Sequence, residues 1–257
     1  NLVPNPSFEK LVGYNSNLYI NSIQIAQPWD TIKGGSGGGG VGIIQTPTIV
    51  LGGEVLFQNA RTGKFMAGVN YYTPISSKWR GYLRAELLAK LVNEKEYCVT
   101  SFFNSINRNQ YGCDELSLFF DDGSLECSAP NDVAFANAQI KSPAGIFLFD
   151  TLNWMKVQGK FKAIGYESHI TIGNFKPQAI TSASIINPNA SAPLADYFLD
   201  DISVIEADLP ANAGRDTVLC TGDSVFIGRP PEIGLECIWN SHGSQIGSGG
   251  GLWVKPS

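Results

Sequence analysis

The stretch YFLDDISV (residues 197–204) places two adjacent acids, Asp200 and Asp201, inside a segment that otherwise has the apolar, β-branched and aromatic character of a buried strand. The first segment of the chain, NLVPNPSFE (1–9), has a similar character and contains a lone acid, Glu9. Carboxylates buried together without a partner repel one another and are costly to desolvate. The partner of these three acids is therefore the first question that the sequence raises.

Outward from this stretch, the chain consists of short strands between turns. GYLRAELLAKL (81–91) is the best helix candidate, but the alternation in the following NEKEYCVTSFF (93–103) favours a strand at 81–88. Several short strands at this spacing imply an all-β sandwich or barrel. We predict strands at 41–50, 64–72, 81–88, 97–104, 115–120, 146–149, 155–163, 168–174 and 197–205.

The composition is that of a turn-rich β protein outside the cytosol. The chain has 257 residues, a formal net charge of −5 and 16% charged residues, with 28 glycines and 14 prolines. No basic stripe is present, and no apolar run approaches the ~20 residues of a membrane helix, so we expect neither a nucleic-acid partner nor membrane insertion. The start at Asn1 suits a mature N-terminus left by a signal peptidase, or an artificial boundary.

The chain has five cysteines, an odd number, so they cannot all be paired in disulfides within the chain. In an exported protein we expect two disulfides and one free thiol, and the alternative is five reduced, buried thiols. Cys220 and Cys237 lie in the last segment. The sequence leaves the pairing of Cys98, Cys113 and Cys127 open.

Three further segments bear on the organisation of the chain. GGSGGGG (34–40) reads as a flexible loop, either natural or engineered, and EVLFQN (54–59) reads as a native strand. IEADLPANAG (205–214) has the composition of a linker. We therefore predict one domain at 1–206 and a second at 207–257.

Several motifs occur in order over residues 1–206. They are NLVPNPSFE (1–9), TGKFMAGVNYY (62–72), WRGYLRAEL (79–87), L-x-x-x-x-E-Y-C-V (91–99), W-x-x-V-x-G-K-F-x-A-x-G-Y-E (154–167), HITIGNF (169–175) and YFLDDISV (197–204). This set resembles jelly-roll domains of the carbohydrate-binding-module type, in particular the variant at the front of large Bacteroidetes cell-surface proteins. The resemblance implies a jelly-roll β-sandwich.

The tail from Ala213 contains the motif Cys-x-Gly-Asp-Ser-Val at 220–225. It resembles the immunoglobulin-like or PKD-like repeats of gliding adhesins and other proteins of the type IX secretion pathway. In those repeats a tyrosine is usual where Cys237 stands, beside Trp239, so the resemblance implies a Cys220–Cys237 disulfide. The closing strands of the repeat are missing, so we expect a longer natural protein and an open strand edge in this partial domain.

The jelly-roll resemblance also suggests a partner for the carboxylates. The first and last strands of a jelly roll lie side by side, which brings Glu9 towards the acidic pair. Successive strand residues face opposite sides, so we expect only Asp201 to face Glu9. Related modules commonly hold a structural calcium here, and Ca²⁺ takes 6–8 oxygen ligands. We carry over Glu9 and Asp201 as calcium ligands; the alternative is that the acids are solvated or bonded to backbone amides.

The resemblance implies a non-catalytic, secreted or cell-surface module that binds glycan or another surface polymer. Sugar-binding surfaces combine exposed aromatic rings with polar side chains, whereas Trp154 and Phe161 match strand positions of the core. The main alternative is a docking module for a protein of the secretion or gliding machinery, and a hydrolase with a hidden acid pair is the third. The ligand candidates are Trp29, Tyr71, Tyr72, Trp79, Arg80, Tyr82, Asn107, Arg108 and Tyr111.

Four tripeptides also fit the O-glycosylation signal of exported Bacteroidetes proteins. They are DTI (30–32), DTL (150–152), DTV (216–218) and DSV (223–225). The implied acceptors are Thr31, Thr151, Thr217 and Ser224.

Overall fold

The structure is a computed structural model that describes residues 1–16, 20–32, 40–46, 48–51, 54–127, 136–208, 212–220, 222–230, 232–235 and 237–255. Apart from three short 3₁₀ turns, η1 (Ile23–Ile25), η2 (Ser77–Trp79) and η3 (Gln178–Ile180), its regular elements are strands. The strands are β1 (Ile20–Asn21), β2 (Val41–Gln45), β3 (Thr48–Leu51), β4 (Glu54–Phe57), β5 (Phe65–Tyr72), β6 (Tyr82–Glu86), β7 (Glu96–Ser105), β8 (Tyr111–Cys113), β9 (Ser117–Asp121), β10 (Ile140–Lys141), β11 (Met155–Lys162), β12 (His169–Gly173), β13 (Ala183–Ile185), β14 (Ala195–Glu206), β15 (Val225–Gly228), β16 (Ile238–Ser241), β17 (Ser244–Ser248) and β18 (Gly251–Val254).

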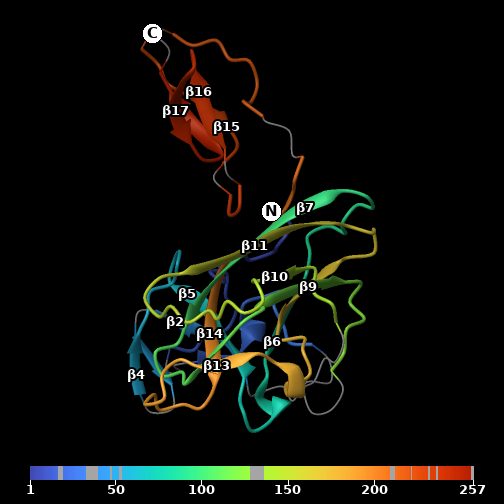
Figure 1. Ribbon diagram of the computed structural model, residues 1–257. Coiled ribbons are helices and arrows are strands. Elements are labelled where there is room, and N and C mark those ends of the chain that lie inside the picture. Colours follow the sequence, from blue (N-terminus) through green and yellow to red (C-terminus); the bar gives the residue numbers. More distant parts are fainter. Residues whose placement is uncertain are drawn as a thin grey trace.

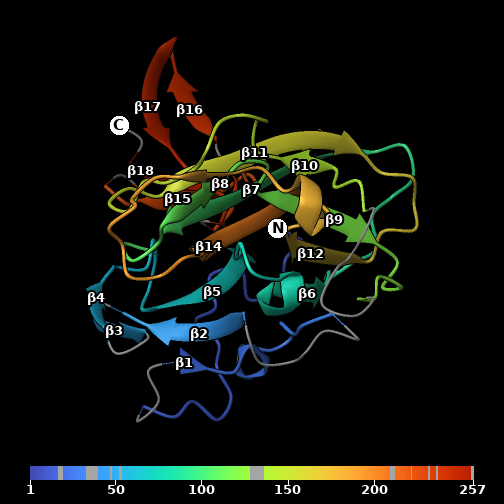
Figure 2. The same cartoon turned by 60° about the horizontal axis from the view of Figure 1, so that its bottom comes forward.

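Two antiparallel sheets form a jelly-roll β-sandwich (Figure 1). The larger sheet has six strands in the order β1-β2-β5-β14-β7-β11, which Figure 2 shows from bottom to top. The smaller sheet has the order β10-β9-β12-β6. The all-β prediction is therefore confirmed.

The main core lies between the two sheets. Tyr71, Phe103 and Tyr197 of the larger sheet meet edge to face, with ring centroids 5.4–6.3 Å apart. The rings of Phe120 in the smaller sheet and Phe161 in β11 pack with their centroids 4.7 Å apart. This contact agrees with the predicted core position of Phe161. Alternation then places the neighbours of such core residues on the outer face of each sheet.

The first segment of the chain lies beside β14. The Leu2 amide donates to the Val204 carbonyl at 2.8 Å, and the Ile202 amide donates to the Pro6 carbonyl at 3.0 Å. The predicted apposition of the first segment and the last strand of the jelly roll is thus confirmed, although residues 1–9 have no regular strand structure.

Most predicted strands are present, including 81–88, which is β6 rather than a helix. The predicted strand at 146–149 is wrong. This segment has one isolated bridge, between Leu148 and Cys113, and otherwise runs as a loop with exposed Ile146 and Phe149. The glycine-rich loop at 34–40 lies outside the described residues except for Gly40.

The C-terminal unit, residues 212–255, contains two strand pairs, β15–β18 and β16–β17. Each of these strands pairs with one other described strand, so each keeps one edge without a partner among the described residues. The positively charged N-terminus of Asn1 forms an ion pair with Glu232 of this unit. Gly234 (φ +83°) packs so tightly on Ser203 of β14 that an added Cβ would lie 2.1 Å from the Ser203 hydroxyl oxygen.

All five cysteines are free thiols in the structure, so the predicted Cys220–Cys237 disulfide is not formed. Cys220 is exposed, whereas Cys237 lines a cleft against β7 and β14. The two thiols therefore lie in different surroundings. No two of the five cysteines are bonded to each other, so the expectation of two disulfides and one free thiol is wrong.

Candidate functional site

The three carboxylates gather around one segment, residues 61–65. Glu9 accepts hydrogen bonds from the amides of Lys64 and Phe65 at 2.9 and 2.8 Å. Asp200 accepts from the amides of Arg61 and Thr62 at 2.8 and 3.1 Å. Backbone N–H groups thus supply much of the stabilisation that the acids need.

Both aspartates reach this segment, which corrects the expectation that they face opposite sides. The register of β14 shifts between Asp200 and Ser203, and Asp201 adopts a left-handed backbone conformation with φ +49°. This bulge lets Asp201 accept from the Thr62 hydroxyl at 2.7 Å and pair with the Arg61 guanidinium. Regular alternation cannot place two adjacent side chains in this way.

With both aspartates ionised, the acidic pair would carry more negative charge than the Arg61 guanidinium neutralises. Burial and the neighbouring Asp201 charge raise the pKa of Asp200 to about 8, although three backbone amides counteract this rise. Below about pH 8 the proton on Asp200 removes this excess charge, and a bound cation would have to displace that proton. The described residues also contain no group of three or more His, Cys, Asp or Glu side chains that could hold a metal ion. Calcium would depend on backbone carbonyl oxygens as further ligands. With Glu9 and Asp201 as its ligands, it stays a prediction.

We expect the free energy of unfolding to fall as the pH rises from about 5 to 8, because Asp200 titrates differently in the two states. Its folded pKa of about 8 exceeds the unfolded value of about 4. The folded state therefore binds the extra proton in this window, and its contribution is full below pH 4 and lost through pH 8. Urea unfolding of the wild type and Asp200→Asn at several pH values should give slopes differing by up to about 1.4 kcal/mol per pH unit. Equal slopes would contradict the assignment.

Four of the nine predicted ligand residues are nearly inaccessible. Trp29 is 1% exposed and its indole N–H donates to the Asn5 carbonyl at 3.0 Å. Tyr71 and Tyr82 are buried, and Arg80 is fixed by hydrogen bonds that include the Thr181 hydroxyl at 2.7 Å. A ring without an exposed face has no surface for stacking on a sugar. The structure therefore removes these residues from the ligand candidates.

The other five predicted ligand residues reach the surface but do not form one site. Trp79 is 49% exposed and has the Lys78 ammonium over its ring. The half-buried rings of Tyr72 and Tyr111 meet edge to face at 5.4 Å. Arg108 is paired with Asp196 at 3.5 Å, and Asn107 is exposed and lines a pocket.

The pocket that contains Asn107 is called the amide pocket below. It has a volume of about 320 Å³. Phe57 at its rim is 69% exposed, and Trp154 is half-buried and packs on a small second cluster on the outer face of the larger sheet. Its polar and aromatic lining comprises two aromatic rings, three amides, one hydroxyl and the guanidinium that pairs with Asp201, namely Phe57, Trp154, Gln58, Asn59, Asn107, Thr151 and Arg61.

Sequence reasoning missed most of this pocket. The sequence predicts Trp154 as a core residue because it matches a strand motif. It predicts only a strand for the segment that contains Phe57, and no role for the Phe57 side chain. The lining comes from three separate segments, at 57–61, 107 and 151–154. No local pattern in the sequence links them.

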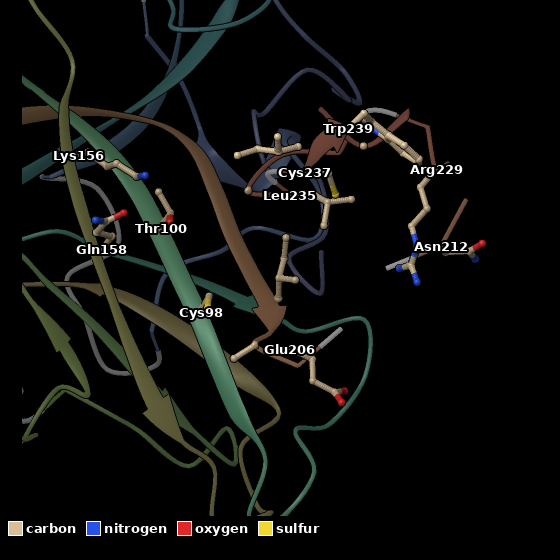
Figure 3. A pocket seen from close by; sticks show the side chains of 15 residues that line it. Cys98, Thr100, Lys156, Gln158, Glu206, Asn212, Arg229, Leu235, Cys237 and Trp239 are labelled. Carbon is tan, nitrogen blue, oxygen red and sulfur yellow. The ribbon is translucent and has the colours of Figure 1, made fainter. Parts of the chain in front are cut away.

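A larger cavity of about 530 Å³, called the cleft below, lies between the larger sheet and the C-terminal unit. Val99 and Val157 point into the core, so alternation turns Thr100, Lys156 and Gln158 outwards into the cleft. Figure 3 shows these three side chains on β7 and β11, with those of the C-terminal unit on the other side. The opposing residues are Leu235, Cys237 and Trp239.

The structure shows how exposed the predicted O-glycosylation acceptors are, but it carries no information on whether they are modified. Thr217 and Ser224 of the C-terminal unit are exposed, and Thr31 and Thr151 are half-buried. Thr151 lines the amide pocket. All four stay predictions.

A hydrolase could use separated acids such as Glu86, Asp114, Glu115 and Glu167, and two of these four accept hydrogen bonds from backbone amides. Glu167 is buried and accepts from the amides of Ile164 and Gly165 at 3.0 and 2.9 Å. Asp114 accepts from the Gly145 amide at 2.8 Å. These carboxylates fix loops by backbone hydrogen bonds.

The fold defines the class of protein as an all-β jelly-roll sandwich followed by a small β unit. No known family model matches the chain, and no curated protein does either. Among solved structures, it is similar to a Family 16 Carbohydrate Binding Module (14% identity, TM-score 0.38, covering 80% of this chain and 100% of that one). It is also similar to the xylan-binding CBM22-1 domain from Paenibacillus barcinonensis (14%, 0.40, 79% and 93%). A third is the K1 cleaved adhesin domain of Lys-gingipain from Porphyromonas gingivalis W83 (13%, 0.42, 78% and 95%). At these identities and scores, the functional proposals rest on the site geometry alone.

The described residues contain no helix that is long and apolar enough to span a membrane.

Proposed function

We propose that this chain is a non-catalytic module that binds a glycan, or another surface polymer, in the amide pocket. The observation that carries the proposal is the combination of two accessible aromatic rings with amide and hydroxyl side chains in one open pocket. The apolar C–H face of a sugar ring packs on an aromatic face, and its hydroxyls need donors and acceptors of this kind.

The proposal includes the setting of the module. A secreted or cell-surface location, as in Bacteroidetes proteins exported by the type IX pathway, accords with the low content of charged residues. Glycan capture there would serve adhesion, gliding or substrate collection. Calcium bound near Asp201 would stabilise the fold and take no part in ligand contact.

A docking role for a protein partner is the second candidate. Three large apolar side chains on one loop, Ile146, Phe149 and Leu152, are between 56% and 81% exposed. Leu152 and Phe57 both line the amide pocket. Such exposed apolar groups are typical of protein-contact surfaces.

A glycan-array screen of the full 257-residue chain, with Ca²⁺ and again with EDTA, tests the proposal. We expect binding to a defined sugar class. Phe57→Ala and Asn107→Ala should each weaken it about tenfold, the equivalent of about 1.4 kcal/mol. Both side chains are exposed, so the fold should tolerate these changes. Loss of thermal stability in EDTA would support the calcium prediction independently.

Trp79→Ala is the matched control, since Trp79 is an exposed aromatic outside the amide pocket. Its affinity should equal that of the wild type. Equal weakening by Trp79→Ala and Phe57→Ala would place the ligand elsewhere. Absence of binding to every glycan by the folded chain would overturn the proposal and favour the docking role.

A further inference from the structure

One wall of the amide pocket comes from a single stretch of chain. Residues 57–61 all line the pocket, and its other lining residues are at 107 and 151–154. The wall begins at the last residue of β4 and continues into the connection to β5, residues 58–64, which has no regular secondary structure. The shape of this wall therefore depends on contacts that the connection makes with the rest of the molecule.

The connection is fastened to β14 by the two adjacent acids. Asp200 accepts hydrogen bonds from the amides of Arg61 and Thr62 at 2.8 and 3.1 Å. Asp201 accepts from the Thr62 hydroxyl at 2.7 Å and pairs with the Arg61 guanidinium. Four contacts thus hold two consecutive residues at the point where the wall ends.

The acids are a firm anchor for this connection. Both are fully buried, on a strand that pairs with β5 on one side and with β7 on the other. The bulge at Asp201 turns both side chains towards the connection. Central strands open rarely, whereas loops with few buried contacts open readily. We therefore expect the order of the wall to come from β14.

Order in the wall affects the affinity of the pocket directly. A wall that is disordered in the free protein has to become ordered when a ligand binds, which lowers the net free energy of binding. The apparent affinity falls in proportion to the fraction of molecules that already have the binding conformation.

We propose that Asp200 and Asp201 are positioning residues of the amide pocket, which hold residues 57–61 in the conformation that binds the ligand. Neither acid lines the pocket, so both act through Arg61 and Thr62 and not by contact with the ligand. The inference rests on the proposed function for its effect on affinity, whereas its effect on the wall is measurable without a ligand.

Thr62 gives the sharpest test, because its side chain is exposed, donates to Asp201 and lies outside the pocket, whereas Arg61 lines the pocket itself. Thr62→Val keeps the shape of the side chain and removes the hydroxyl, and Thr62→Ser keeps the hydroxyl. Hydrogen exchange of the ligand-free full chain, followed by mass spectrometry, measures the order of the wall. Exchange over residues 58–61 should become about fivefold faster in Thr62→Val and stay unchanged in Thr62→Ser. Exchange over 151–154 should stay unchanged in both.

Calorimetry with the strongest-binding oligosaccharide of the glycan array measures the effect on affinity. Thr62→Val should bind it about fivefold more weakly, and Thr62→Ser should bind it as tightly as the wild type. Thr46→Val is the matched control, since the Thr46 hydroxyl donates to the Lys64 carbonyl of the same connection at 3.2 Å and not to an acid. This control should keep the affinity of the wild type.

The proposal fails on any of three results. They are unchanged exchange over residues 58–61 in Thr62→Val, failure of Thr62→Ser to restore the wild-type values, or equal weakening of binding by Thr46→Val and Thr62→Val. Faster exchange in Thr62→Val, together with absence of glycan binding by the wild type, would support the anchoring of the wall and overturn the glycan ligand alone.

Discussion

Replacing Arg61 with glutamine is expected to lower the free energy of unfolding by about 2–3 kcal/mol at pH 9. Its guanidinium pairs with the fully buried Asp201 and lies 3.6 Å from the centre of the Phe102 ring. Removing one partner of a buried ion pair leaves an uncompensated charge, which costs roughly 3–5 kcal/mol. The Arg61 side chain is about one-third exposed, so solvent screening reduces the effect.

Urea unfolding of Arg61→Gln measures this loss, with Arg215→Gln as the control. Arg215 is exposed in the C-terminal unit, and its replacement should change the stability by less than about 0.5 kcal/mol. A loss equally small for Arg61→Gln would show that backbone donors alone satisfy the acidic pair. Recovery of the variant on addition of Ca²⁺ would show that the aspartates accept a metal ion.

Trp29→Ala is expected to lower the free energy of unfolding by about 3–5 kcal/mol, the range for removing a large aromatic side chain from a core. Trp29 packs on Phe8 with ring centroids 5.2 Å apart, and its indole N–H bonds to the Asn5 carbonyl. The change would leave a cavity and an unpaired carbonyl where the first segment of the chain meets the sandwich.

Trp29→Phe separates stability from binding, because it keeps most of the buried volume and loses the hydrogen bond. Its thermal midpoint should fall while its affinity for any glycan stays that of the wild type. Trp253→Ala, which removes a 69% exposed ring, should leave the stability almost unchanged. Weakened glycan binding by folded Trp29→Phe would restore Trp29 as a ligand residue.

Much of the fold could be predicted from the sequence because alternation and turn chemistry are local signals. They identify β7, β11, β12 and β14, and they favour a strand for β6. The apposition of the first segment and β14 followed from the jelly-roll resemblance. The failure at 146–149 has a physical reason, since an apolar run in a loop has the same residue types as a short strand.

The sites were harder to predict because they depend on contacts between distant segments. Trp29 follows a proline and precedes a glycine-rich loop, which suggests exposure, yet it packs under residues 1–9. The bulge at Asp201 breaks the alternation on which the assignment of one acid to each face depended. The amide pocket and the cleft each join segments that lie far apart in the sequence.

The central place of β14 has a mechanical consequence. This strand pairs with β5 on one side and with β7 on the other, and it leads from Glu206 towards the C-terminal unit. Antiparallel hydrogen bonds lie perpendicular to the strand, so tension along β14 loads them together in shear instead of opening them one at a time. A pulling force applied between the amide pocket and the C-terminal unit would therefore be resisted by all the hydrogen bonds of β14 at once.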